Sequence, residues 1–243
     1  MIAIISDIHS NFEALNAVID DFKNYSITEI FCCGDIVGYG PNPNECIEIL
    51  KNKNILSVIG NHDAAIIDEV NLDWFNKDAK EAILINKKII SQENLKYIKT
   101  LPRYIIKNEL LLVHGSPRDP IYEYLLTPNF LEINIKHMKQ KICFCGHTHI
   151  PLIYSKSSDE KSKIYYPKNN FSIKLEKDKK YIINVGSIGQ PRDLDNKACY
   201  VIFDDENYIL HFKRIDYNFH LTQQKMIQLQ LPKFLVERIE FGE

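Results

Sequence analysis

The chain has 243 residues, of which 45% are apolar and 26% are charged, and its formal net charge is −2. This length allows a sizeable core, and the composition is ordinary for a globular protein. The slightly negative charge argues against a surface dedicated to nucleic acid or to an anionic membrane, because the overall field would attract neither. No apolar stretch approaches the ~18 residues of a membrane-spanning helix.

Five short apolar runs rich in Ile and Val predict buried strands, and each ends at residues that can bind a metal ion. In chain order these are Met1–Ser6 before Asp7 and His9, Ile30–Cys33 before Asp35, Ile55–Ile59 before Asn61, His62 and Asp63, Leu110–Val113 before His114, and Ile142–Cys145 before His147 and His149. Ligands of an open α/β sheet bind beyond the carboxyl ends of its strands. The pattern therefore predicts a metal-centred active site at one sheet edge. Polar residues that merely mark strand ends would explain one or two of these cases, but not all five.

Helices are predicted between these strands. Periodicity and capping signals mark Phe12–Phe22, Asn42–Lys53, Asn76–Ile90, Gln92–Lys99 and a segment that begins at Thr127–Pro128. The alternation of strands and helices over the first 60 residues implies parallel pairing with crossover helices. Tyr104–Lys107 and Leu110–Val113 flank a polar turn and predict a hairpin.

After residue 150 the chain changes to short strands separated by polar turns. Strands are predicted at Leu152–Tyr154, Ile164–Tyr166, Phe171–Leu175, Tyr181–Val185, Cys199–Phe203 and Tyr208–Ile215. We expect an antiparallel block that forms a second sheet packed on the first. Because His147 and His149 directly precede this block, we predict one domain over residues 1–243, with a helical tail of about 218–243 packed on it. The lysine-rich stretch Lys156–Lys180 has mixed charges, which favours a solvated hairpin face over a nucleic-acid patch.

The six cysteines form no zinc or disulfide pattern. Cys32 and Cys33 are adjacent, Cys143 and Cys145 alternate within a predicted strand, and no pair has CxxC spacing. The N-terminus has no basic segment before its apolar run, so a secretory signal is not expected. These features predict reduced, mostly buried cysteines and a cytoplasmic protein.

The side chains at the strand ends supply oxygen and nitrogen ligands without a thiolate, which favours Mn²⁺, Fe or Zn²⁺ over a structural cysteine–zinc site. Seven ligands are too many for one ion but suit two ions that share a carboxylate. Two divalent ions less two aspartates leave about two positive charges, a local field that attracts a phosphate group. The sequence therefore predicts phosphate-ester chemistry at a dinuclear centre.

The order of the motifs DIH, GD, GNHD, VHG and GHTH resembles that of the calcineurin-like metallophosphoesterases, and the resemblance spans Met1 to about Asp193. It implies a four-layer α/β sandwich of two mixed sheets flanked by helices. By matching positions, Asp7, His9 and His149 would hold the first metal, Asn61, His114 and His147 the second, and Asp35 would bridge them. His62 would orient or protonate the leaving group, with Asp63 as its orienting partner. The two ions would be Mn²⁺ first, with Fe, Ni²⁺ or Zn²⁺ as alternatives.

The stretches GDIVGYGP, FNKDAKEA and NVGSIGQPRD resemble the small bacterial and archaeal phosphodiesterase branch. The loop after Asp35 lacks the Asp and Arg that protein phosphatases and dinucleoside tetraphosphatases carry there. The resemblance thus implies hydrolysis of small or nucleotide phosphodiesters by in-line attack of a hydroxide held between the metals. A phosphomonoesterase or nucleotide pyrophosphohydrolase with the same centre is the alternative, and a non-catalytic scaffold is a lesser one. The natural substrate and the oligomeric state stay open.

Two further residues are candidates for binding substrate. Arg192 follows a strand that should end near the site, and its guanidinium matches phosphate oxygens in a bidentate manner. A surface ion pair with Asp193 or Asp195 explains Arg192 equally well. Tyr39 and Tyr122 follow motifs and are candidates for stacking on a base or aryl leaving group, although an exposed loop tyrosine is the commoner case. His137, His211 and His220 lie outside every motif and are expected to be ordinary histidines.

Overall fold

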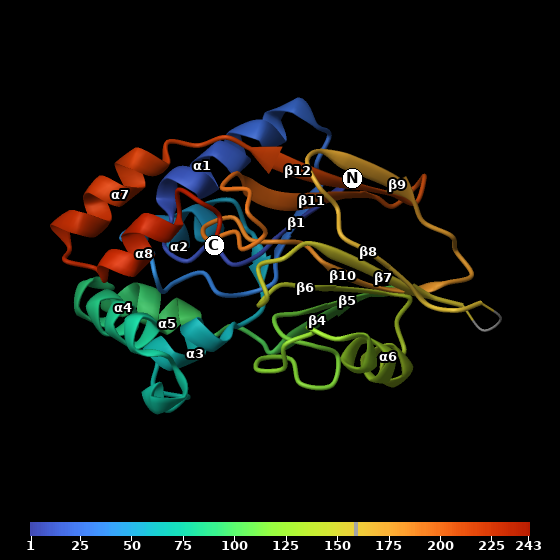
Figure 1. Cartoon of the computed structure of the whole chain (residues 1–243), viewed down its shortest axis with the longest axis horizontal. Coiled ribbons are helices and arrows are strands. Elements are labelled where there is room, and N and C mark those ends of the chain that lie inside the picture. The colour runs from blue at the N-terminus through green and yellow to red at the C-terminus, as the bar shows by residue number, and fades with distance from the viewer. Residues whose placement is uncertain (158–159) are drawn as a thin grey trace.

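The chain builds twelve strands and eight α-helices within residues 1–157 and 160–243, which the computed structural model describes (Figure 1). The strands are β1 (Ile2–Ile5), β2 (Glu29–Cys32), β3 (Leu56–Ser57), β4 (Tyr104–Lys107), β5 (Leu110–Val113), β6 (Ile142–Cys145), β7 (Leu152–Lys156), β8 (Lys163–Tyr165), β9 (Phe171–Lys174), β10 (Lys180–Asn184), β11 (Ala198–Asp204) and β12 (Ile209–Ile215). The helices are α1 (Phe12–Asp21), α2 (Pro43–Asn52), α3 (Asn61–Ile66), α4 (Lys77–Ile89), α5 (Gln92–Ile98), α6 (Pro128–His137), α7 (Phe219–Gln228) and α8 (Lys233–Arg238), with 3₁₀ turns η1 (Phe22–Asn24) and η2 (Leu72–Trp74).

Two mixed six-stranded sheets lie at the centre, with helices on their outer faces (Figure 1). The first has the order β3-β2-β1-β11-β12-β9, and the second has the order β4-β5-β6-β10-β7-β8. Neighbouring strands are parallel in β1–β2, β2–β3, β5–β6 and β6–β10, and antiparallel elsewhere. The four-layer α/β sandwich that the resemblance implied is confirmed.

The late strands do not form a sheet of their own, so that prediction was wrong. β11, β12 and β9 extend the first sheet from β1, whereas β10, β7 and β8 extend the second sheet from β6. The physical reason is that β1 and β6 would otherwise be edge strands with unpaired backbone groups. Pairing the late strands with these two edges satisfies those groups. The five motif-bearing strands are therefore divided between two sheets and do not share one sheet edge.

Alternation along the strands produces the layers. In β1, Ile2 and Ile4 face the second sheet and pack with Phe31 and Phe144, while Ala3 and Ile5 face the helices. α1 and α2 cover the outer face of the first sheet, and α6 covers that of the second. All six cysteines are free and buried in these layers, as predicted.

The C-terminal segment forms α7 and α8 beside α1 and α4 (Figure 1). Met226 and Leu235 pack with Ala79 and Ala82 of α4, and Tyr39 belongs to the same apolar cluster. The C-terminal segment thereby supports a loop that carries a predicted site residue. None of the described helices is long and apolar enough to cross a membrane.

Candidate metal centre

All seven predicted ligands are buried at the ends of β1, β2, β3, β5 and β6 and converge on one place. Five of them have left-handed backbone conformations: Asp7 (φ 50°), His9 (φ 48°), Asp35 (φ 53°), His147 (φ 68°) and His149 (φ 61°). Such conformations cost about 1–3 kcal/mol each for residues other than glycine and tend to occur at functional sites. These strained backbone conformations turn the five side chains inward where the strands end.

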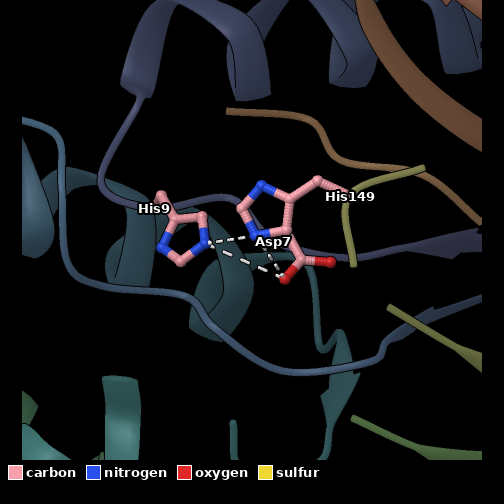
Figure 2. Close-up of side chains that lie close together, drawn as sticks. All are labelled: Asp7, His9 and His149. Carbon is pink, nitrogen blue, oxygen red and sulfur yellow. Dashed lines mark hydrogen bonds and ion pairs between the residues drawn. The ribbon is translucent and has the colours of Figure 1, made fainter. Parts of the chain in front are cut away.

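Asp7, His9 and His149 form the first cluster, shown in Figure 2. The Nε2 atoms of His9 and His149 are 3.1 Å apart. Asp7 Oδ1 lies 3.3 Å from His149 Nε2 and 3.8 Å from His9 Nε2. Three atoms that could bind a metal ion, from the loops after β1 and β6, therefore surround the point where the first metal is predicted.

The second cluster surrounds His114 Nε2. This atom lies 2.9 Å from Asn61 Oδ1, 2.9 Å from His147 Nδ1 and 3.4 Å from Asp35 Oδ2. Asp35 Oδ2 is also 3.6 Å from Nε2 of His9 in the first cluster. The Asp35 carboxylate therefore lies between the two clusters, the position that the bridging assignment requires.

The backbone determines which ring nitrogen of each ligand histidine points inward. The outer ring nitrogens lie beside carbonyl oxygens: His9 Nδ1 beside Val37 (3.1 Å), His114 Nδ1 beside Cys33 (2.9 Å), His149 Nδ1 beside Gln190 (2.6 Å) and His147 Nε2 beside Tyr122 (3.2 Å). Because a carbonyl only accepts hydrogen bonds, each outer nitrogen carries the hydrogen, and the inner nitrogen of a neutral ring presents a lone pair. Inward lone pairs and carboxylate and amide oxygens are all acceptors. These inward-facing atoms can all act as metal ligands, and together they fit two divalent cations.

The electrostatics agree with a site built for cations. Burial alone would raise the pKa of Asp7 and Asp35, but neighbouring histidines outweigh it and hold both pKa values below the usual range. Burial lowers the pKa of His147 well below its usual value. Burial also opposes protonation of His114, yet the attraction of Asp35 raises the pKa of His114 to about 9. Without metal, a proton on His114 Nε2 is therefore held among the atoms that would bind the second ion.

Asp63 does not orient His62, contrary to the prediction. Asp63 Oδ1 accepts hydrogen bonds from the backbone N–H groups of Ile36 and Val37, and Oδ2 accepts one from that of Gly60. The physical reason is that α3 begins at Asn61, so Asp63 lies in its first turn and reaches back to free N–H groups. Asp63 thus holds the loop after Asp35 against the start of α3.

His62 is positioned by rings and by its backbone. Its N–H donates to Asp35 Oδ1 at 2.9 Å, and its ring lies 4.4 Å from the ring of Tyr39 and 5.0 Å from that of Phe75 between centroids. Its buried Nδ1 has no hydrogen-bond partner among the described residues. Burial lowers the pKa of His62 to about 4, so the ring is neutral at pH 7 when no substrate is bound.

Tyr39 and Arg192 lie together beside the metal centre. Tyr39 is only 7% exposed, which corrects the expectation of an exposed loop tyrosine, and its ring contacts His9. Arg192 Nη2 donates to Gln190 Oε1 at 2.8 Å and to the Tyr39 hydroxyl at 3.3 Å, while its buried Nε has no partner among the described residues.

The carboxylates next to Arg192 in the sequence bind a different arginine. Asp193 and Asp195 both form ion pairs with the buried Arg214 of β12. Arg192 has no ion pair within the described part of the chain, so the interpretation as a surface ion pair was wrong. Among the described residues, the Arg192 guanidinium beside the metal centre therefore has no carboxylate partner.

Two residues that shape the site were not predicted from the sequence, Asn86 and Tyr124. Asn86 is fully buried in α4, where its side chain bonds Ser10 Oγ (2.7 Å), the Gly38 N–H (3.1 Å) and the Gly40 carbonyl (3.0 Å), and so fixes the loop after Asp35. Tyr124 stacks on His147 with ring centroids 3.6 Å apart. Neither residue belongs to a motif, and only the tertiary structure brings them to the site.

Comparison with known proteins agrees with this geometry. A family model for the calcineurin-like phosphoesterase superfamily domain matches residues 1–207. An uncharacterized protein of Methanocaldococcus jannaschii is 44% identical over 250 residues, a match that covers 100% of this chain and 98% of the relative. A metallophosphoesterase from Sphaerobacter thermophilus has a crystal structure with a TM-score of 0.88 at 38% identity, covering 100% of this chain and 98% of that one. A hypothetical protein from Pyrococcus horikoshii OT3 has a TM-score of 0.82 at 21% identity, covers 100% of this chain and 99% of that one, and so shows the fold alone.

Proposed function

Since the chain belongs to the calcineurin-like phosphoesterase superfamily, we propose that it is a phosphodiesterase that uses two divalent ions, Mn²⁺ first, to hydrolyse small or nucleotide phosphodiesters. The observation that carries this proposal is the convergence of acceptor atoms at two adjacent points with Asp35 between them. Two divalent ions in such a site supply a hydroxide nucleophile at neutral pH and bind the phosphoryl oxygens.

The protein's own residues have distinct parts in this proposal. Asp7, His9 and His149 would hold the first ion, Asn61, His114 and His147 would hold the second, and Asp35 would be shared by both. The carbonyl oxygens behind the four histidines keep the rings in one orientation and one tautomer. The ligands are thus in place before substrate binds, which reduces the reorganisation that the reaction requires.

Arg192 is proposed to bind the substrate's phosphate. Its guanidinium lies 5.7 Å from the centroid of the Tyr39 ring, and its Nε has no hydrogen-bond partner among the described residues, so it retains hydrogen-bonding capacity. Arginine binds phosphate oxygens through a planar fork, which lysine does not offer. Arg192→Lys should therefore raise KM for a phosphodiester while the metal content stays at the wild-type value.

His62 is proposed to donate a proton or hydrogen bond to the leaving oxygen. Its ring is neutral at pH 7 in the free protein, since burial holds its pKa at about 4. A negative phosphate beside the ring favours the protonated form and raises that pKa. The acid role therefore depends on bound substrate, and the ring contacts with Tyr39 and Phe75 keep His62 in place.

The alternative is a phosphomonoesterase with the same centre. The diester is favoured because the loop Gly34–Gly40 offers no side-chain cation, which leaves Arg192 to balance the substrate charge. The test compares rates on bis-p-nitrophenyl phosphate and p-nitrophenyl phosphate with Mn²⁺. We expect preference for the diester, and a marked preference for the monoester would overturn the assignment.

A scaffold without activity is the remaining alternative, and metal analysis addresses it. All seven ligand positions hold residues that bind metals, and they converge as a working site would require. Protein purified without chelator should contain bound divalent metal and should turn over a diester. Less than one ion per chain, with no turnover in any added divalent metal, would favour the scaffold.

A further inference from the structure

A cavity of about 220 Å³ opens beside the metal centre. Three of its lining residues, Asn61, His62 and His147, belong to the centre described above. The other walls come from Tyr39, Val70, Trp74, Phe75, Asn76, Ala79, Tyr122 and Tyr124. A substrate whose phosphorus lies at the metals would therefore place one ester group in this cavity, on the side of His62.

The walls of this cavity are aromatic and uncharged. Trp74 in η2 is 74% exposed, and its ring lies edge-on to that of Tyr122 with centroids 5.9 Å apart. Tyr124, which stacks on His147, is 43% exposed. None of the described lining residues is Asp, Glu, Lys or Arg. These walls offer π faces for stacking and no ionic partner.

The segments on both sides of the cavity make polar contacts on the face away from the cavity. Glu123, between the two tyrosines, accepts hydrogen bonds from Ser116 Oγ (2.7 Å) and Asn134 Nδ2 (2.6 Å) and pairs with Arg118. On the other side, Asp73 next to Trp74 pairs with Lys80 of α4. The segment that carries Tyr122 and Tyr124 is therefore anchored by polar contacts, as expected of a prebuilt binding site, whereas the ion pair beside Trp74 is exposed to solvent.

The volume of the cavity and the charges near it limit which ligands can bind there. Pockets for drug-sized ligands have volumes of roughly 300–1,000 Å³, so this cavity suits a single ring system. Aromatic walls also bind quaternary ammonium groups. Here, however, Arg192 lies near the centre with no carboxylate partner in the part of the chain that the structure describes, and the bound ions would add positive charge, so a cation would be repelled. A planar, uncharged ring fits both conditions.

We propose that this cavity binds the nucleobase of a nucleotide ester whose phosphate lies at the metal centre, with Trp74 and Tyr122 as stacking surfaces. The inference rests on the proposed function and names its substrate class. Stacking of a base on an aromatic side chain is worth about 1–3 kcal/mol, which corresponds to roughly 5- to 150-fold in a dissociation constant.

Trp74 is the chain's single tryptophan, so its fluorescence reports on this cavity directly. The Zn²⁺-loaded protein is titrated with adenosine 5′-phosphate, with ribose 5-phosphate and with phosphocholine. We expect adenosine 5′-phosphate to quench the emission and to bind roughly 5- to 150-fold more tightly than ribose 5-phosphate, which has the same sugar phosphate without the base. Equal binding of these two compounds, or tighter binding of phosphocholine, would overturn the inference.

Matched variants separate a specific site from general damage. Tyr122→Ala keeps the reporter and should lose most of the preference for adenosine 5′-phosphate, whereas Tyr165→Ala, which alters an exposed tyrosine of β8 outside the cavity, should keep it. Metal content is measured in both, because the Tyr122 backbone carbonyl accepts from His147. Loss of the preference in both variants, or in neither, would also count against the inference.

Hydrolysis of bis-p-nitrophenyl phosphate is measured in parallel. Activity without base preference overturns this inference alone, whereas inactivity on every diester overturns the proposed function.

Discussion

Metal binding should release a proton from His114 at neutral pH. In the metal-free protein Asp35 outweighs burial and raises the pKa of His114 to about 9. The outer nitrogen of this ring already donates to the Cys33 carbonyl, so the additional proton resides on Nε2. That atom faces Asn61 Oδ1 and His147 Nδ1, each at 2.9 Å, where the second ion would bind. The proton and the ion therefore compete for the same lone pair.

The size of the effect follows from the pKa. At pH 7 the ring is two pH units below its pKa of about 9, so about 1% of it is free to bind metal. The apparent affinity of the second site should therefore rise about tenfold from pH 7 to 8 and about fivefold from pH 8 to 9, which is about 50-fold or about 2.3 kcal/mol in all. His114 should contribute about one proton to the release per chain at pH 7 and about half a proton near pH 9, in addition to any proton that a metal-bound water loses.

Calorimetric titration with Mn²⁺ in buffers of different ionisation enthalpy measures this release. His137→Gln is the control, because His137 lies at the end of α6 outside the site. An affinity independent of pH between 7 and 9, with no proton released, would show that the ion does not compete with a proton on His114. The metal-free fold gives a second readout: since the His114 pKa is raised, its contribution to stability is full below pH 6.5 and is lost as pH rises through about 9. The thermal midpoint of the metal-free protein should fall across that window.

Three substitutions test other parts of the site. His62→Gln should keep both metals and lose little on bis-p-nitrophenyl phosphate but ~10²–10⁴-fold on a nucleoside diester, because p-nitrophenolate leaves without a proton; equal losses would mean that His62 positions the phosphate. Gly38→Ala should lower kcat with metals retained, because a Cβ there would lie 2.3 Å from His62 Nδ1 at a φ of +94°, and an unchanged kcat would contradict this contact. Asp63→Ala should cost about 1–3 kcal/mol in denaturant unfolding, since buried N–H groups lose their acceptor, and wild-type stability would be the contrary result.

The convergence of the seven predicted ligands could be predicted from the sequence because each follows an apolar strand in a recognisable motif. Asp7 follows β1 after one residue, and His114 directly follows β5; both strands are apolar and buried throughout. The position of these two residues beyond a strand end can therefore be predicted without long-range information. The sheet pairing did need it. Whether β11 joins β1 or a separate sheet depends on unpaired edges that strand periodicity does not reveal.

Local patterns also failed where a side chain has two possible partners. Asp63 follows His62 directly, yet the helical turn that begins at Asn61 directs it to backbone N–H groups instead. Arg192 precedes Asp193, but Arg214 from β12 binds that carboxylate. In both cases a partner from a distant part of the chain is observed in place of the neighbouring residue in the sequence. This is expected because a buried charge requires a partner of good geometry.

One carboxylate, Asp35, is proposed to serve both metal ions. Metal analysis of the wild type, Asp35→Asn and Asp7→Asn, each equilibrated with Mn²⁺ and desalted, tests it most directly. We expect two ions per chain in the wild type and damage to both sites in Asp35→Asn. In Asp7→Asn the weakening should fall chiefly on the first site, since Asp7 lies in the first cluster alone. Two ions at wild-type affinity in Asp35→Asn, or a single ion in the wild type, would contradict it.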